Sequence, residues 1–120
     1  PQVTSTSARP FADQTAATIL NADEAGFRTG QEQTAAGLAR DPATRTVMVE
    51  WSMTSDRQAM AAAIRDVMTT DVRPGLAAMT TPVWAVYAAD ADGRVDDSRH
   101  FIMADQPARF AAIVDRFLVE

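Results

Sequence analysis

Apolar residues in the first 70 positions of the chain recur every three or four residues, which is the spacing of amphipathic helices. Each of these stretches follows a residue that favours a helix N-terminus. We therefore predict four helices, over residues 8–22 after Ser7, 24–39 after Asp23, 43–53 after Asp41 and Pro42, and 56–68 after Ser55. On the first helix we expect the buried face to hold Phe11, Thr15, Ile19 and Ala22.

The pattern changes after Asp71, where Pro74 and Gly75 end the helical spacing. Residues 83–87 then form a short, continuous apolar run, which is typical of a strand buried on both faces in a parallel sheet. A weaker candidate strand covers residues 94–96. The second half of the chain is thus predicted to contribute strands to a sheet.

A regular apolar stripe follows these strands and predicts a closing helix from residue 105 or 106 to about residue 119. Helices first and strands later indicate an α/β protein. We expect two regions, a helical cap over residues 1–70 and part of an α/β core over residues 71–120.

The composition excludes several classes of protein. The net charge of −5 leaves no basic surface for binding nucleic acid. The 120 residues include no cysteine and one histidine, so we predict neither disulfides nor a metal site. No apolar run approaches the roughly 20 residues that a membrane span requires. Because the chain opens with Pro1 and not with Met, we expect it to be a piece of a longer protein.

Asp90 and His100 are the candidates for chemistry. Asp90 comes just after the predicted strand over 83–87, and open α/β sheets bind ligands at that end of their strands. A histidine loop after the next strand would lie at the same edge. There the carboxylate could orient the imidazole, and the imidazole could deprotonate a nucleophile. The alternative interpretation is an exposed turn aspartate and a surface histidine.

Two segments of the second half carry a family resemblance. DVRPGLAAMTTPVWAVYAAD (71–90) and DDSRHFIMADQPARFAAIVDRFL (96–118) resemble the C-terminal half of serine hydrolases of the α/β-hydrolase fold. The match is closest in HFIMADQPARF, from His100 to Phe110, whereas residues 88–90 have alanine in place of the glycine in the family's acid-bearing turn.

The resemblance implies a role for each part of the chain. The helices before Asp71 would form the cap that these enzymes insert, and the remainder would hold the last core strands and the closing helix. His100 would be the general base and Asp90 its orienting acid. Less favoured alternatives for the acid are Asp92, Asp96 and Asp97. The resemblance implies no cofactor.

The chain departs from the hydrolase pattern in two ways. No G-x-S-x-G occurs, so the nucleophilic serine must come from residues outside this sequence, and we expect the chain alone to be inactive. Asp90 and His100 are only ten positions apart, too few for a crossover between parallel strands. Either the strands pair as a hairpin at DADG or residues are missing between them, and we favour the second interpretation.

Two functions are compatible with these patterns. The preferred one is part of an esterase-like hydrolase with a Ser-His-Asp mechanism, completed by a missing N-terminal half or a second chain, which cleaves an ester or related acyl bond of a small to medium apolar substrate. The alternative is a non-enzymatic helical module that binds an apolar ligand or a partner protein. Both allow self-association. Candidate substrate contacts, which could equally be ordinary helix packing, are Met48, Trp51, Met53 and Phe101.

Overall fold

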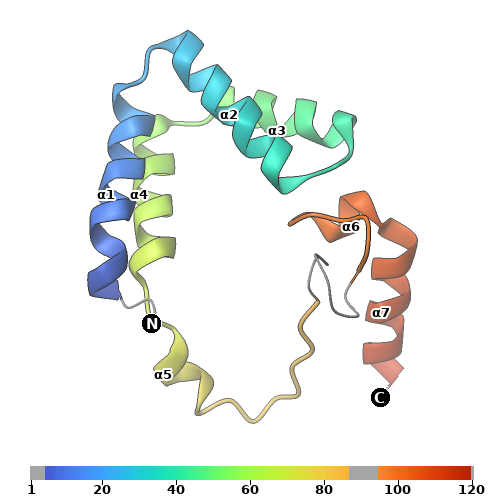
Figure 1. The fold of residues 1–120 in the computed structure, drawn as a ribbon. Coiled ribbons are helices and arrows are strands. Elements are labelled where there is room, and N and C mark those ends of the chain that lie inside the picture. Colours follow the sequence, from blue (N-terminus) through green and yellow to red (C-terminus); the bar gives the residue numbers. More distant parts are fainter. Residues whose placement is uncertain (1–4, 87–94, 120) are drawn as a thin grey trace. The chain divides into compact units, whose positions relative to one another are not determined.

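The computed structural model describes residues 5–86 and 95–119, and the regular structure in these residues is helical (Figure 1). The helices are α1 (Ser5–Asn21), α2 (Glu24–Leu38), α3 (Pro42–Thr54), α4 (Arg57–Thr69), α5 (Arg73–Leu76), α6 (Ile102–Asp105) and α7 (Pro107–Val119). The four helices predicted in the first 70 residues are confirmed as α1 to α4, and the closing helix is confirmed as α7.

Aspartate side chains fix the starts of three helices. Asp23, Asp41 and Asp56 each accept a hydrogen bond from the backbone N–H three residues further on, at 2.7–2.8 Å. Each bond satisfies a donor in the first helical turn that has no acceptor within the helix. Two predicted caps are wrong, because Ser7 lies inside α1 and Asp56, not Ser55, caps α4.

The described residues form two compact units. The first unit holds the residues up to Phe27 together with Thr54–Thr81. The second holds Arg28–Met53 and the residues from Pro82 onward. The division into a cap and a core near residue 70 stays a prediction.

Small side chains form the interface of the first unit, in which α1 packs along α4 (Figure 1). Ala12 and Ala16 of α1 are fully buried, and Ala61 of α4 is nearly so. Methyl side chains allow the two helix backbones to approach closely. Phe11, which was expected on the buried face of α1, is instead 63% exposed.

Phe27 is the large apolar side chain that the first unit buries among its described residues, with 4% of its surface exposed. The guanidinium of Arg57, at the start of α4, lies 4.1 Å from the centre of the Phe27 ring. Its Nη1 also donates to the carbonyl oxygen of Ala22. This one side chain therefore joins the turn between α1 and α2 to α4 through a cation–π contact and a hydrogen bond.

In the second unit, the turn between α2 and α3 is joined to the loop that leads into α6. The backbone N–H of Phe101 donates to the carbonyl oxygen of Leu38 at 2.9 Å. Further along, α6 packs on α7, and the Trp84 ring lies 5.7 Å from that of Phe117 on α7. The buried apolar side chains of this unit are Ala35, Ala39, Val49, Val95 and Ile102.

The predicted α/β fold, an α/β-hydrolase half with core strands behind a helical cap, is wrong. Residues 5–86 and 95–119 contain no β-strand. Of the run over 83–87, residues 83–86 are irregular and Val83 is 65% exposed, while Tyr87 lies outside the described residues. In the second candidate strand, Val95 forms a single bridge, Asp96 lies in a turn, and Arg94 is not described. Without neighbours to pair with, a short apolar segment gains nothing from an extended conformation.

Two glycines of α2 provide a test of this helix. A Cβ added at Gly30 or Gly37 would meet no atom within 4 Å. Gly30→Ala and Gly37→Ala should each raise the free energy of unfolding by about 0.5–1 kcal/mol, because alanine loses less backbone entropy than glycine on forming a helix. Urea denaturation followed by circular dichroism measures the change.

Gly26, in the first turn of the same helix, is the matched control. A Cβ there would lie 2.9 Å from Oδ1 of Asp23, the atom that caps the helix. Gly26→Ala should therefore gain nothing or lose stability. An equal gain from all three substitutions would contradict the cap geometry.

Candidate functional site

A groove between α3 and the α6 segment of the second unit is lined mainly by apolar side chains, and we call it the α3–α6 groove. Its volume is about 400 Å³, within the range of small-molecule sites. Residues of α3 and the turn before it form one wall, namely Asp41, Ala43, Thr44, Val47, Met48 and Trp51. The other wall holds Phe101, Met103 and Ala104.

The structure brings three of the four predicted substrate contacts into this groove. Met48, Trp51 and Phe101 all line it, although they come from stretches about 50 residues apart in the sequence. Met53 lies on α3, half-buried, and is not among the lining residues. Val47 and Met103 also line the groove but were not predicted to do so, because neither carries a local signal beyond the apolar spacing of its own helix.

The groove leaves large apolar side chains exposed to water. Trp51 is 68% exposed, Met103 49% and Val47 39%. Covering the rest of the Trp51 side chain with another apolar surface would stabilise a complex by about 3 kcal/mol. Exposed apolar groups gathered in one concavity are typical of a binding surface.

Asp105, the last residue of α6, fixes the position of one wall against the other. Its Oδ1 accepts hydrogen bonds from the backbone N–H groups of Arg40 at 2.7 Å and Asp41 at 3.1 Å, and its Oδ2 accepts one from Arg99 at 2.8 Å. Burial raises the pKa of Asp105, but the hydrogen bonds from these three N–H groups together lower it by more than burial raises it. The pKa of Asp105 therefore lies below its usual 3.8. The sequence pattern predicted that the closing helix starts at residue 105 or 106, whereas the Asp105 side chain connects the α2–α3 turn to the loop before α6.

Asp41 places a second ionised carboxylate at the start of α3. Its Oδ2 accepts hydrogen bonds from both the hydroxyl and the backbone N–H of Thr44, each at 2.7 Å. The Thr44 hydroxyl, and then its N–H, lower the pKa of Asp41 below 3.8. The negative charge of the nearby Asp105 raises the pKa of Asp41 and so opposes this shift. Two like charges therefore lie close together at this end of the groove.

His100, the predicted base, lies exposed in the loop before α6. Its ring meets the edge of Phe101, with the ring centres 5.4 Å apart and the planes at 88°. Within the described residues no hydrogen bond or ion pair joins His100 to a carboxylate. The described structure therefore gives this imidazole no orienting acid.

The predicted acids divide into two groups. Asp90 and Asp92 lie outside the described residues. Asp96 and Asp97 are directed at arginines, with Asp96 3.6 Å from Arg109 and Asp97 3.6 Å from Arg40. The described alternatives for the triad acid thus contribute to surface ion pairs and not to a pair with His100.

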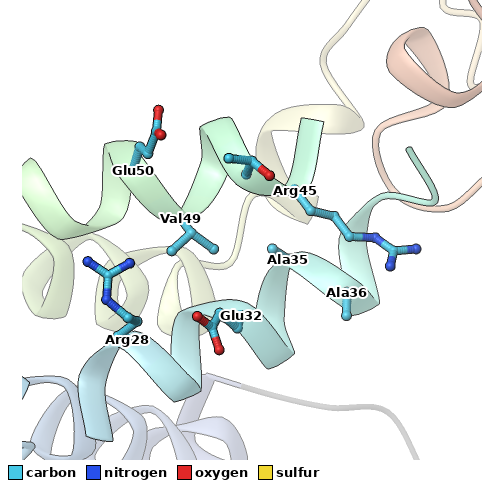
Figure 2. A pocket seen from close by; sticks show the side chains of 8 residues that line it. Arg28, Glu32, Ala35, Ala36, Arg45, Val49 and Glu50 are labelled. Carbon is cyan, nitrogen blue, oxygen red and sulfur yellow. The ribbon is translucent and has the colours of Figure 1, made fainter. Parts of the chain in front are cut away.

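A second groove, of about 370 Å³, lies between α2 and α3 (Figure 2). Figure 2 shows Val49 pointing from α3 toward α2, with Arg28 and Arg45 at opposite ends. Nε of Arg45 donates to the carbonyl oxygen of Ala39 at 2.7 Å, so this side chain closes the C-terminal end of α2. The remaining lining residues are Glu32, Ala35, Ala36, Thr46 and Glu50. Half of its lining is charged, so the α3–α6 groove is the better site for an apolar group.

In the part of the chain that the structure describes, no helix has both the length and the apolar character needed to cross a bilayer. No group of three or more carboxylate or imidazole side chains in residues 5–86 and 95–119 is arranged to hold a metal ion.

Comparison with known proteins corrects the resemblance that the sequence suggested. No protein-family model, no curated protein and no solved structure matches this chain. The assignment to the α/β-hydrolases, with its catalytic triad, is therefore wrong, since it lacks both a family match and a sheet in the described residues.

Proposed function

We propose that this chain is a non-enzymatic helical module that binds an apolar group of a ligand or partner in the α3–α6 groove. The observation that carries the proposal is the exposure of Trp51, Met103 and Val47 in one concavity. Methionine adds to the fit, because its flexible, polarisable side chain adapts to differently shaped apolar surfaces. The hydrogen bonds of Asp105 hold the two walls in place before binding, which lowers the entropic cost of forming the site.

Ester hydrolysis by a completed enzyme stays a prediction from the sequence. It requires a base with an orienting acid and a nucleophile, and the described contacts of His100 support neither. Binding needs only the groove, so it is the function that the described geometry supports best.

Binding of N-phenyl-1-naphthylamine, a neutral apolar fluorophore, tests the proposal. The intact chain should bind this probe with an increase in fluorescence, because the apolar walls exclude water from it. Trp51→Ala should weaken binding at least tenfold, as expected for a large aromatic side chain that anchors a bound apolar group. Fluorescence titration measures both affinities.

Val67→Ala is the matched control for this experiment. Val67 lies on α4 in the other unit and is also largely exposed, so its removal takes away apolar surface that does not line the groove. Probe affinity should remain unchanged in this variant. A similar loss in both variants, or no binding by the intact chain, would overturn the proposed function.

A further inference from the structure

The two ends of the α3–α6 groove differ in polarity. Asp41 and Thr44 line it at the start of α3, whereas Val47, Met48 and Trp51 line it further along the same helix. From Asp41 to Trp51 the helix rises about 15 Å. The groove thus has one polar end, and the rest of its length is apolar.

The charge at the polar end is negative. Asp41 is the charged residue among those that line the groove. This carboxylate is ionised at neutral pH, as aspartates ordinarily are, and a second carboxylate, that of Asp105, lies close to it. The guanidinium of Arg40 is directed at Asp97 and its charge also acts on Asp105, whereas that of Arg45 lies in the other groove. Neither arginine lines the α3–α6 groove, so Asp41 is the charge that a ligand there would meet.

We infer that the natural occupant of the α3–α6 groove is a small amphiphilic amine, with its ammonium group at Asp41 and its hydrocarbon tail along Val47, Met48 and Trp51. This inference rests on the proposed function and adds to it the chemical class of the ligand. A carboxylate at one end of an apolar groove favours a ligand with a cationic head group. It disfavours a fatty acid with a tail of the same length, because the carboxylate of the fatty acid would lie against Asp41. The net charge of −5 also attracts a cation from a distance.

Three ligands with the same tail and different heads provide the test. Dodecylammonium, dodecanol and dodecanoate are titrated below their micelle concentrations, and each is measured by displacement of N-phenyl-1-naphthylamine. Dodecylammonium should bind most tightly and dodecanoate most weakly. Equal affinities for the three heads would overturn the inference but leave the proposed function intact. If the fluorophore itself does not bind, the proposed function fails as well.

Asp41→Asn separates the charge from the fold. Asparagine caps a helix as well as aspartate does, so α3 should still form. Affinity for dodecylammonium should fall about fivefold, the upper end for a partly exposed ion pair, whereas affinity for dodecanol should not change. Asp97→Asn, at an exposed residue outside the groove, removes the same charge and should change neither affinity by as much as twofold.

Two further results would overturn the inference. One is an equal loss of dodecylammonium affinity in both asparagine variants, which would show that only the net charge matters. The other is binding of a cationic amphipathic peptide with no binding of dodecylammonium, which would indicate a protein partner. If Asp41→Asn does not fold, the salt dependence of the intact chain decides, since only dodecylammonium binding should weaken as ionic strength rises.

Discussion

Replacing Asp105 by alanine should lower the free energy of unfolding of the second unit by about 3 kcal/mol. The substitution removes the acceptor of three backbone N–H groups, two in the α2–α3 turn and one in the loop before α6. Hydrogen bonds to a charged acceptor contribute about 1.5–3 kcal/mol each, and water at these partly exposed groups recovers some of the loss. Asp105→Asn retains one carbonyl acceptor and should fall between alanine and the native residue.

Tryptophan fluorescence during urea denaturation measures this loss in the correct unit, because Trp51 and Trp84 both lie in the second unit. Asp115→Ala, an exposed aspartate on α7, is the matched control and should change stability by less than about 0.5 kcal/mol. N-phenyl-1-naphthylamine should also bind more weakly to Asp105→Ala, since the two hydrogen bonds that Asp105 accepts from the opposite wall are lost. Equal effects of the two substitutions would contradict the role of Asp105.

The effect of Asp105→Ala should depend on pH in one direction. The pKa of Asp105 is lower in the folded chain than its usual 3.8, so its contribution to stability is complete above about pH 4. As the pH falls toward the pKa that Asp105 has in the folded chain, protonation removes that contribution. The difference in the free energy of unfolding between the native chain and Asp105→Ala should therefore become smaller. Asp71 also has a lowered pKa, but it lies in the other unit and remains in the variant, so its contribution cancels from the difference between the two proteins. Removal of the Asp105 charge lowers the pKa of Asp41 further, so the difference reports Asp105 together with its effect on Asp41.

The helices could be predicted from the sequence because their signals are local. The apolar spacing and the caps at Asp23 and Asp41 each involve residues within one or two turns of each other. The conformation of the segment over 83–87, by contrast, is not determined by signals within the segment. A short apolar run has strand character only if other strands pair with it, and nothing within the run itself shows whether they exist.

The buried face of α1 shows a second limit of sequence patterns. Hydrophobicity favoured Phe11, whereas the interface with α4 is built on Ala12 and Ala16. Large apolar side chains gain more from burial, but two closely packed helices have room only for small ones. Which of these effects prevails depends on the partner helix, and the spacing within α1 does not contain that information.

The site was predictable only in part for a related reason. Met48, Trp51 and Phe101 were candidates because they are large, apolar and adaptable, and the fold brings them together. Asp105 acts on residues 64 and 65 positions earlier in the chain, a contact that its own surroundings do not reveal. The sequence around His100 resembles that of a family whose catalytic histidine depends on a β-sheet. The described residues contain no such sheet, so the role predicted for His100 lacks its structural basis.

Replacing Phe27 by alanine should destabilise the first unit by about 3 kcal/mol, the lower end for a buried phenylalanine. Its ring fills the space beside Arg57 at the end of the α1–α4 pair, so alanine leaves a cavity and removes the cation–π contact. Phe11→Ala makes the same chemical change at a largely exposed position of α1 and should cost less than about 0.5 kcal/mol.

Amide hydrogen exchange of α1 and α4 measures the loss caused by Phe27→Ala, because this unit contains no tryptophan. Exchange in these two helices should accelerate in Phe27→Ala and remain unchanged in Phe11→Ala. Arg57→Ala should cost less than Phe27→Ala, since the ring stays in place when the cation over it is lost, although the carbonyl of Ala22 then loses its donor. Equal acceleration of exchange in Phe11→Ala and Phe27→Ala would mean that α1 buries its Phe11 face against α4, as the sequence pattern predicted. An interface built on Ala12 and Ala16 would then be wrong.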